Sequence, residues 1–159
     1  MYPHSSQGLK FIISTIEYFT KWVEAITLIE IKALKIVEFI ETNLICRFGI
    51  SSKLIMDNGL PFKNKDVQAL CEKYHIQLSL FIPYYPQANG QVKASDKTII
   101  KVLFVGDSQR DWHNKLSYAL WAYRTSIRTP TKATSFSIIY GAEVILPIEL
   151  KIPSLHISL

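Results

Sequence analysis

Short β-branched runs alternate with amphipathic segments along most of this chain, and this alternation restricts its fold more than any other feature. The first two runs, Lys10–Tyr18 and Trp22–Ile29, are separated by only three residues, a spacing typical of a β-hairpin. Residues Ile31–Phe48 then carry apolar side chains at helical spacing, and Gly49 follows as a helix stop. The pattern predicts an α/β fold with a mixed β-sheet flanked by helices.

The remaining segments continue the alternation. Further strands are expected at Lys53–Met56, which reads as buried, and at Ile76–Phe81; helices are expected at Asn64–Tyr74, around Lys93 and at Asp111–Ser126, and a long loop at Ile82–Gln91. The core-facing residues expected from helical spacing are Leu34, Val37, Ile40, Leu44, Ile45, Val67, Leu70, Cys71, Tyr74, Val92, Ile99, Val102, Leu103, Leu116, Leu120 and Tyr123. The tail after Gly141 has an irregular pattern and two prolines, so we expect a linker there.

Composition narrows the class of partner. The chain has 159 residues, enough for one domain, and 48% hydrophobic residues are enough for a packed core. Its formal net charge is +5, which favours an anionic partner such as nucleic acid without proving one. No apolar run reaches the roughly 18 residues of a membrane span, so no membrane partner is expected.

Three features are candidates for a functional site, and each has an ordinary structural alternative. Asp57 ends a strand, where ligand sites of α/β sheets lie, but Asp57-Asn58-Gly59 is also a common turn. The second feature is a set of lysines spaced by four on one helix face, which suits phosphate binding or a solvated surface equally; these are Lys93, Lys97 and Lys101. Polar and aromatic residues of the preceding loop could contact nucleic acid or pack the loop; these are Tyr85, Gln87 and Asn89.

Five blocks of the chain, in this order, are similar to blocks of integrase cores from gypsy-type LTR retrotransposons. They read EYFTKWVEA, RFGISSKLIMDNG, YYPQANGQVKASDKTI, RDWHNKLSYALWAYRTS and SFSIIYGAEVILP. The resemblance implies an RNase H-like fold, with the core over residues 1–147 and a linker or C-terminal extension over 148–159. It also implies that the cofactor is Mg²⁺, for which Mn²⁺ can substitute, and that the partner is DNA. A homo-oligomer is possible in this family. The expected location is intracellular, in the nucleus.

The resemblance further implies a metal site made of three carboxylates, because hard Mg²⁺ prefers oxygen ligands. Asp57 matches the second carboxylate, and residues 58–92, thirty-five in all, separate it from the third position. That position is Lys93, where the family pattern has Glu. The family's first carboxylate lies on a strand upstream of the hairpin, and we expect that strand to be lacking here. Asp57 alone should hold Mg²⁺ weakly at best.

Three functions follow for such a chain. The first is a nucleic-acid-binding domain from a retrotransposon polyprotein that is catalytically defective, because of Lys93 and the missing carboxylate. The second is an active Mg²⁺-dependent polynucleotidyl transferase fragment of a longer protein. The third is a decayed fragment without function. The substitution at Lys93 favours the first of these functions. Glu17 lies at the end of a predicted strand, and we do not assign it to the three metal-binding carboxylates.

Overall fold

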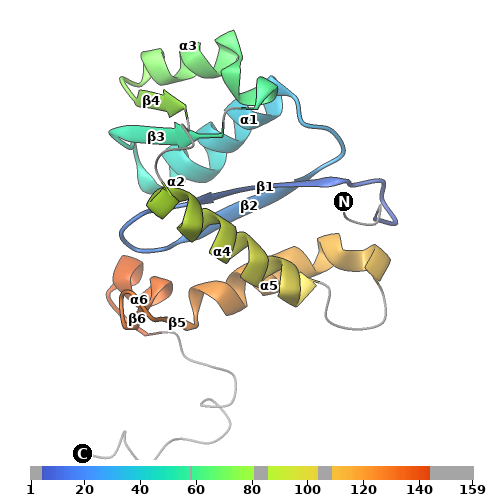
Figure 1. Ribbon diagram of the computed structural model, residues 1–159, viewed down its shortest axis with the longest axis vertical. Coiled ribbons are helices and arrows are strands. Elements are labelled where there is room, and N and C mark those ends of the chain that lie inside the picture. Colours follow the sequence, from blue (N-terminus) through green and yellow to red (C-terminus); the bar gives the residue numbers. More distant parts are fainter. Residues whose placement is uncertain (1–4, 58, 81–85, 104–108, 144–159) are drawn as a thin grey trace, which may run out of the picture.

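The computed structural model of the chain describes residues 5–57, 59–80, 86–103 and 109–143. A β-hairpin runs through the middle, with one group of elements on each side of it (Figure 1). Its strands are β1 (Phe11–Ile16) and β2 (Val23–Leu28), which pair antiparallel in continuous register. The turn between them uses Lys21 in a left-handed conformation, with φ of 60°. The predicted hairpin is therefore confirmed.

The helical segment after the hairpin is continuous but not uniform. It consists of α1 (Ala33–Phe39), the π-helical segment η1 (Ile40–Ile45) and α2 (Cys46–Phe48). Gly49 ends it with φ of 87°, a conformation that favours glycine. The predicted helix is confirmed, but its apolar face was placed wrongly at Leu34, which is 69% exposed. Ile36 and Phe39 are buried instead, because the face turned to the strands lies about half a turn further along.

A strand–helix–strand unit packs on this helix. The strands β3 (Lys53–Met56) and β4 (Gln77–Leu80) pair in parallel, and η2 (Leu60–Lys63) and α3 (Lys65–Lys73) connect them. Asn64 begins α3 as predicted, because its side chain accepts a hydrogen bond from the Asp66 backbone N–H at 2.9 Å. The expectation of a fully buried Lys53–Met56 strand was wrong. Ile55 is 51% exposed, since alternate side chains of β3 point away from α1 and α3.

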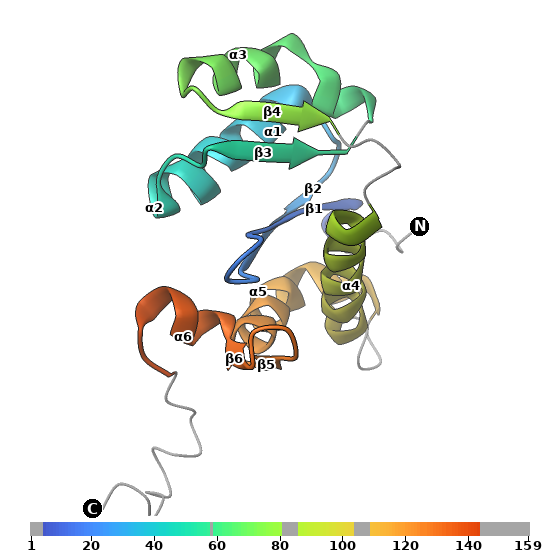
Figure 2. The ribbon, with the colours of Figure 1, turned by 60° about the vertical axis from the view of Figure 1, so that its left-hand side comes forward.

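The four predicted strands pair in both parallel and antiparallel directions, but they form two separate pairs. The antiparallel pair β1–β2 and the parallel pair β3–β4 are separate two-stranded sheets in the described part of the chain. Both views show β3 on the side of its pair that is nearer the hairpin (Figures 1 and 2). The helix α1 joins the two pairs through a shared apolar core, so packing rather than strand pairing connects them.

The second half of the domain covers the other side of the hairpin. Its elements are α4 (Pro86–Leu103), η3 (Gln109–Asp111), α5 (Trp112–Arg124), β5 (Ile127–Arg128), β6 (Ala133–Thr134) and α6 (Ser135–Tyr140). The α4 and α5 positions predicted to be core-facing are buried at Ile99, Leu103, Leu116, Leu120 and Tyr123. Val102 was wrongly included, since it is 37% exposed. Helices on both sides of the strands confirm the α/β fold class (Figure 2).

The start of α4 differs from the prediction. Residues Ile82–Gln91 were expected to form a loop, but the helix already begins at Pro86 and includes Asn89 and Gly90. Proline suits the first turn of a helix, because its fixed φ matches and its missing N–H has no partner to lose there. The Asn-Gly turn signal is overridden by this start. The remainder of the expected loop, 82–85, and the expected linker, 148–159, lie outside the described residues.

Candidate functional site

The candidate site is built on the carboxyl ends of β3 and β4. Asp57 follows the last residue of β3 directly and is exposed. Both strands run parallel, so their carboxyl ends lie at one edge, and Figure 2 shows this edge on the same side of the molecule as α4. In open α/β sheets such an edge is where ligands bind. The structure thus places Asp57 at the kind of edge that the sequence indicated.

The three candidate lysines lie on α4 as predicted. Lys93, Lys97 and Lys101 are all exposed, and each follows the previous one by four residues on the same helix. Four residues of an α-helix advance about 6 Å along the axis and rotate about 40°, so the three side chains form one shallowly twisted row. We call these three residues the lysine row. It begins two turns after the start of α4 and continues toward the end of the helix.

The other predicted nucleic-acid contacts are only partly placed. Gln87 and Asn89 lie within α4, in its first two turns, and not in a loop as expected. Tyr85 lies outside the described residues. In the described part of the chain, these polar residues therefore do not form the loop site that was expected. What remains of the predicted interface is helical and centres on the lysine row.

Asp96 lies one turn after Lys93 but has a different environment. It is half-buried, and its Oδ1 accepts a hydrogen bond from the Ser14 hydroxyl of β1 at 2.5 Å. Burial raises the pKa of Asp96, and the hydrogen bond from Ser14 opposes that shift without cancelling it. The carboxylate is thus directed to the hairpin, where it fastens α4 to β1.

The carboxylates of the described residues do not fit a three-carboxylate magnesium site. No group of three or more histidine, cysteine, aspartate or glutamate side chains within the described ranges is arranged to hold a metal ion. The third position implied by the family resemblance, Lys93, carries a positive charge instead of a negative one. We therefore derive no chemical step that passes through a bound metal.

Glu17 has a structural role in the hairpin turn. Its Oε2 accepts hydrogen bonds from the backbone N–H of Phe19 at 3.0 Å and of Thr20 at 2.6 Å, and from the Thr20 hydroxyl at 2.8 Å. Burial alone would raise the pKa of Glu17, but these hydrogen bonds and the charge of Lys21 outweigh it, so the pKa is lowered. These contacts hold the turn between β1 and β2.

A buried ion-pair network was not found from the sequence. Glu24 of β2 is only 3% exposed and lies 3.0 Å from nitrogens of both Arg124 and Arg47. It also accepts a hydrogen bond from the Trp22 indole N–H at 2.8 Å, and Arg124 donates to the Val23 carbonyl. The only signal was a glutamate within an otherwise apolar strand. The network joins the hairpin to α2 and α5.

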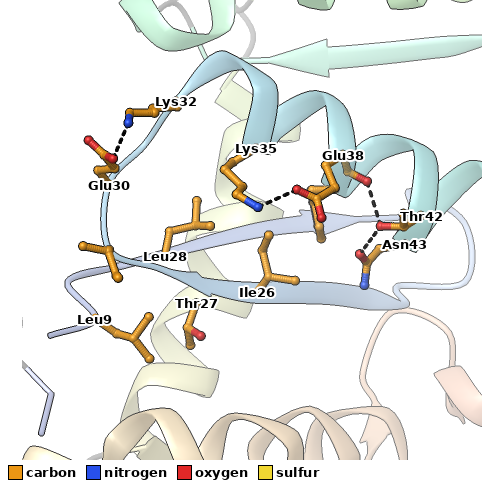
Figure 3. A pocket seen from close by; sticks show the side chains of 12 residues that line it. Leu9, Ile26, Thr27, Leu28, Glu30, Lys32, Lys35, Glu38, Thr42 and Asn43 are labelled. Atoms are coloured by element: carbon orange, nitrogen blue, oxygen red, sulfur yellow. Dashed lines mark hydrogen bonds and ion pairs between the residues drawn. The ribbon is translucent and has the colours of Figure 1, made fainter. Parts of the chain in front are cut away.

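A separate hollow lies away from these residues. A groove of about 490 Å³ separates β2 from α1, with an apolar floor that includes Leu9, Ile26 and Leu28 (Figure 3). Its charged rim is internally paired: Glu30 with Lys32 at 2.5 Å, and Lys35 with Glu38 at 2.7 Å. None of the predicted site residues lines it. A rim with balanced charges gives no preference for an anionic ligand.

The fold and the strand-end site define a class, the RNase H-like cores of integrases, and the solved structures agree. The chain superimposes on the catalytic core domain of BIV integrase with a TM-score of 0.66 and 26% identity, over 80% of this chain and 83% of that one. The HTLV-2 integrase catalytic core domain in complex with magnesium, in a trimeric form, gives 0.63 at 19% identity, over 80% of this chain and 82% of that one. A chain of a simian T-cell lymphotropic virus intasome in complex with PP2A regulatory subunit B56 gamma gives 0.73 at 18%, over 92% of this chain and 54% of that one.

Sequence relatives give the particular family. The chain is 31% identical over 144 residues to the Pol polyprotein of feline endogenous virus ECE1, covering 87% of this chain. It is 29% identical over 138 residues to the Gag-Pol polyprotein of avian reticuloendotheliosis virus, covering 84%. The chain spans only 13% and 12% of the length of those two polyproteins. No family model matches. The chain belongs to the integrase catalytic cores of LTR elements, as the sequence predicted, while the gypsy type stays a prediction.

Proposed function

We propose that this chain is a DNA-binding integrase core that does not join DNA ends by itself. The observation that carries the proposal is the lysine row, Lys93, Lys97 and Lys101, which is exposed along α4. Lysine side chains neutralise phosphates and release counterions, which supplies affinity without reading the base sequence. The formal net charge of +5 supports an anionic partner.

The proposed loss of activity rests on the carboxylates. By the family resemblance, Asp57 is one of three metal ligands, and the position of the third is Lys93. An ammonium group at that position repels a divalent cation, and a single exposed carboxylate binds Mg²⁺ weakly. We also include self-association in the proposal, since the HTLV-2 core is described in a trimeric form. The nucleus is the proposed place of action.

Within the described ranges, no helix is long and apolar enough to cross a lipid bilayer.

A strand-transfer assay with Mg²⁺ or Mn²⁺, run beside a binding titration on duplex DNA, tests both halves of the proposal. We expect salt-sensitive, sequence-tolerant binding and no joined product. Lys93→Glu should weaken binding without creating activity, because no third metal-ligating side chain of the described residues is arranged beside Asp57. Joining by the unmodified chain would overturn the inactive half and favour the active transferase fragment. Absence of binding at low salt would refute the DNA-binding half.

A further inference from the structure

A small cavity lies between the hairpin turn, α4 and the end of α5. Its volume is about 210 Å³, and its polar lining residues are Lys21, Ser95, Thr98, Tyr123, Arg128 and Thr129. Among the described residues that line it, two are cationic and none is acidic. A water molecule takes about 30 Å³ in the liquid, so the cavity has room for one tetrahedral anion with part of its hydration. It is too small for a drug-sized ligand.

The positive charge of Arg128, which lines this cavity, has no acidic side chain in an ion pair with it among the described residues. Its Nη2 donates to the Tyr123 carbonyl at 2.5 Å, and its guanidinium carbon lies 3.4 Å from the centre of the Tyr123 ring. Its Nε is buried and has no hydrogen-bond partner, and none of the ion pairs of the described residues includes Arg128. Burial lowers the pKa of Arg128, and Tyr123 partly opposes that shift.

Arg124, four residues earlier, is a cation whose charge is balanced by an acidic side chain. It is also partly buried, but Glu24 lies 3.0 Å away and the Val23 carbonyl accepts from both its Nε and its Nη2. Arg128 is also partly buried, but its guanidinium contacts the Tyr123 carbonyl and ring and not a carboxylate of the described residues, so an external anion in the cavity would balance its charge. Turning the Arg128 guanidinium toward such an anion breaks no hydrogen bond of its Nε, since that atom makes none.

Hydroxyl groups add a donor to the same cavity. The Ser95 and Tyr123 hydroxyls lie 2.8 Å apart and share one hydrogen bond. The pair has two protons and that bond uses one, so one O–H can donate to a ligand. Two residues that line the cavity, Ala94 and Thr98, each follow a lysine of the row directly on α4.

We propose that this cavity binds a phosphate group, held by the Arg128 guanidinium and a hydroxyl of the Ser95–Tyr123 pair in the positive field of Lys21. The phosphate is either a phosphodiester of a DNA strand that also contacts the lysine row, or free inorganic phosphate. The first source rests on the proposed DNA binding, whereas the site itself is measured without DNA.

The test is a titration of the ¹⁵N-labelled chain with inorganic phosphate, following the arginine Nε–Hε resonances by NMR at constant ionic strength. We expect the Arg128 resonance to shift and saturate in phosphate, while an equal ionic strength of chloride leaves it unchanged. Arg128→Lys keeps the charge but loses the fork of donors, and should weaken phosphate binding about tenfold or more. Lys21→Gln should weaken it severalfold.

Lys132→Gln is the matched control, since Lys132 is exposed in the β5–β6 connection and does not line the cavity. It should leave the affinity for phosphate unchanged. If phosphate shifts Arg128 no more than chloride does, Arg128 only caps the end of α5 and the proposal is wrong; this holds even if Arg128→Lys fails to fold. A duplex oligonucleotide that shifts Arg128 assigns the site to a DNA phosphate. If inorganic phosphate shifts the Arg128 resonance and the duplex does not, the site binds the free anion. If the chain then binds no duplex at all, only the proposed function is refuted.

Discussion

Replacing the lysine row by glutamine should change the salt dependence of DNA binding by a calculable amount. In the variant Lys93→Gln, Lys97→Gln and Lys101→Gln, three exposed cations are removed from α4. Each phosphate contact contributes about −0.9 to the slope of log affinity against log salt, so three contacts account for about −2.7. Between about 50 and 200 mM salt, that part of the slope alone lowers the affinity of the unmodified chain about 40-fold. Fluorescence anisotropy on one duplex at four or more salt concentrations measures it.

The control must remove the same charge from another surface. Lys32→Gln, Lys35→Gln and Lys65→Gln act just before α1, in α1 and in α3, across the hairpin from α4 (Figure 1). Either variant takes the formal net charge from +5 to +2. Glutamine and lysine have similar helix propensity, and the exposed ion pairs of Lys32 and Lys35 are worth at most about 1 kcal/mol each, so stability should change little in either variant. The reasoning is refuted if the α4 variant keeps its slope within about 0.5 of the original, or if the control loses as much.

Three further predictions concern stability. Glu17→Gln should lower the free energy of unfolding in urea by about 1 kcal/mol at neutral pH, after discount for solvent screening. Because the pKa of Glu17 is lowered on folding, the difference should vanish as pH falls through that pKa, and a difference that persists in acid contradicts the turn-capping role. Asp96→Asn should not lower the melting temperature at pH 7. The pKa of Asp96 is raised on folding, so the stability that this carboxyl contributes at low pH is lost as pH rises. Asparagine can still accept the hydrogen bond from the Ser14 hydroxyl. Arg124→Met should cost about 1–3 kcal/mol by calorimetry, because Glu24 keeps Arg47 and the Trp22 indole as partners. Combination with Glu24→Gln should recover part of that cost, and strict additivity would exclude the ion pair.

The elements that rest on local chemistry could be predicted from the sequence. The hairpin follows from two β-branched runs across a three-residue connection, and the start of α3 follows from the capping geometry of Asn64. Gly49 ends its helix with the positive φ that a glycine stop implies. Each of these depends on residues within one or two turns of each other, which is the range that sequence periodicity describes.

Tertiary context decided the rest. The burial of Ile36 rather than Leu34 depends on which side of α1 the strands occupy. The helical start at Pro86 overrides the turn signal of Asn89-Gly90. Glu24 is buried because Arg124, a hundred residues later, reaches it, and no local pattern contains that information. The same holds for the cavity at Arg128, which combines three elements that are far apart in the sequence.

Under the proposed function, the positive charge of residue 93 favours contact with a DNA backbone over a metal site. A unit charge about 4 Å from an ammonium is worth about 4 kcal/mol at an effective dielectric of about 20, and a divalent cation doubles that to about 8. Since about 1.4 kcal/mol is a factor of ten in binding, repulsion of this size would weaken a metal ion beside Lys93 by nearly six orders of magnitude. Weak binding of Mg²⁺ by one exposed carboxylate, Asp57, cannot offset such a loss. The same charge attracts phosphate and extends a row that Lys97 and Lys101 already form on α4, so the electrostatics that oppose a metal site favour contact with a DNA backbone.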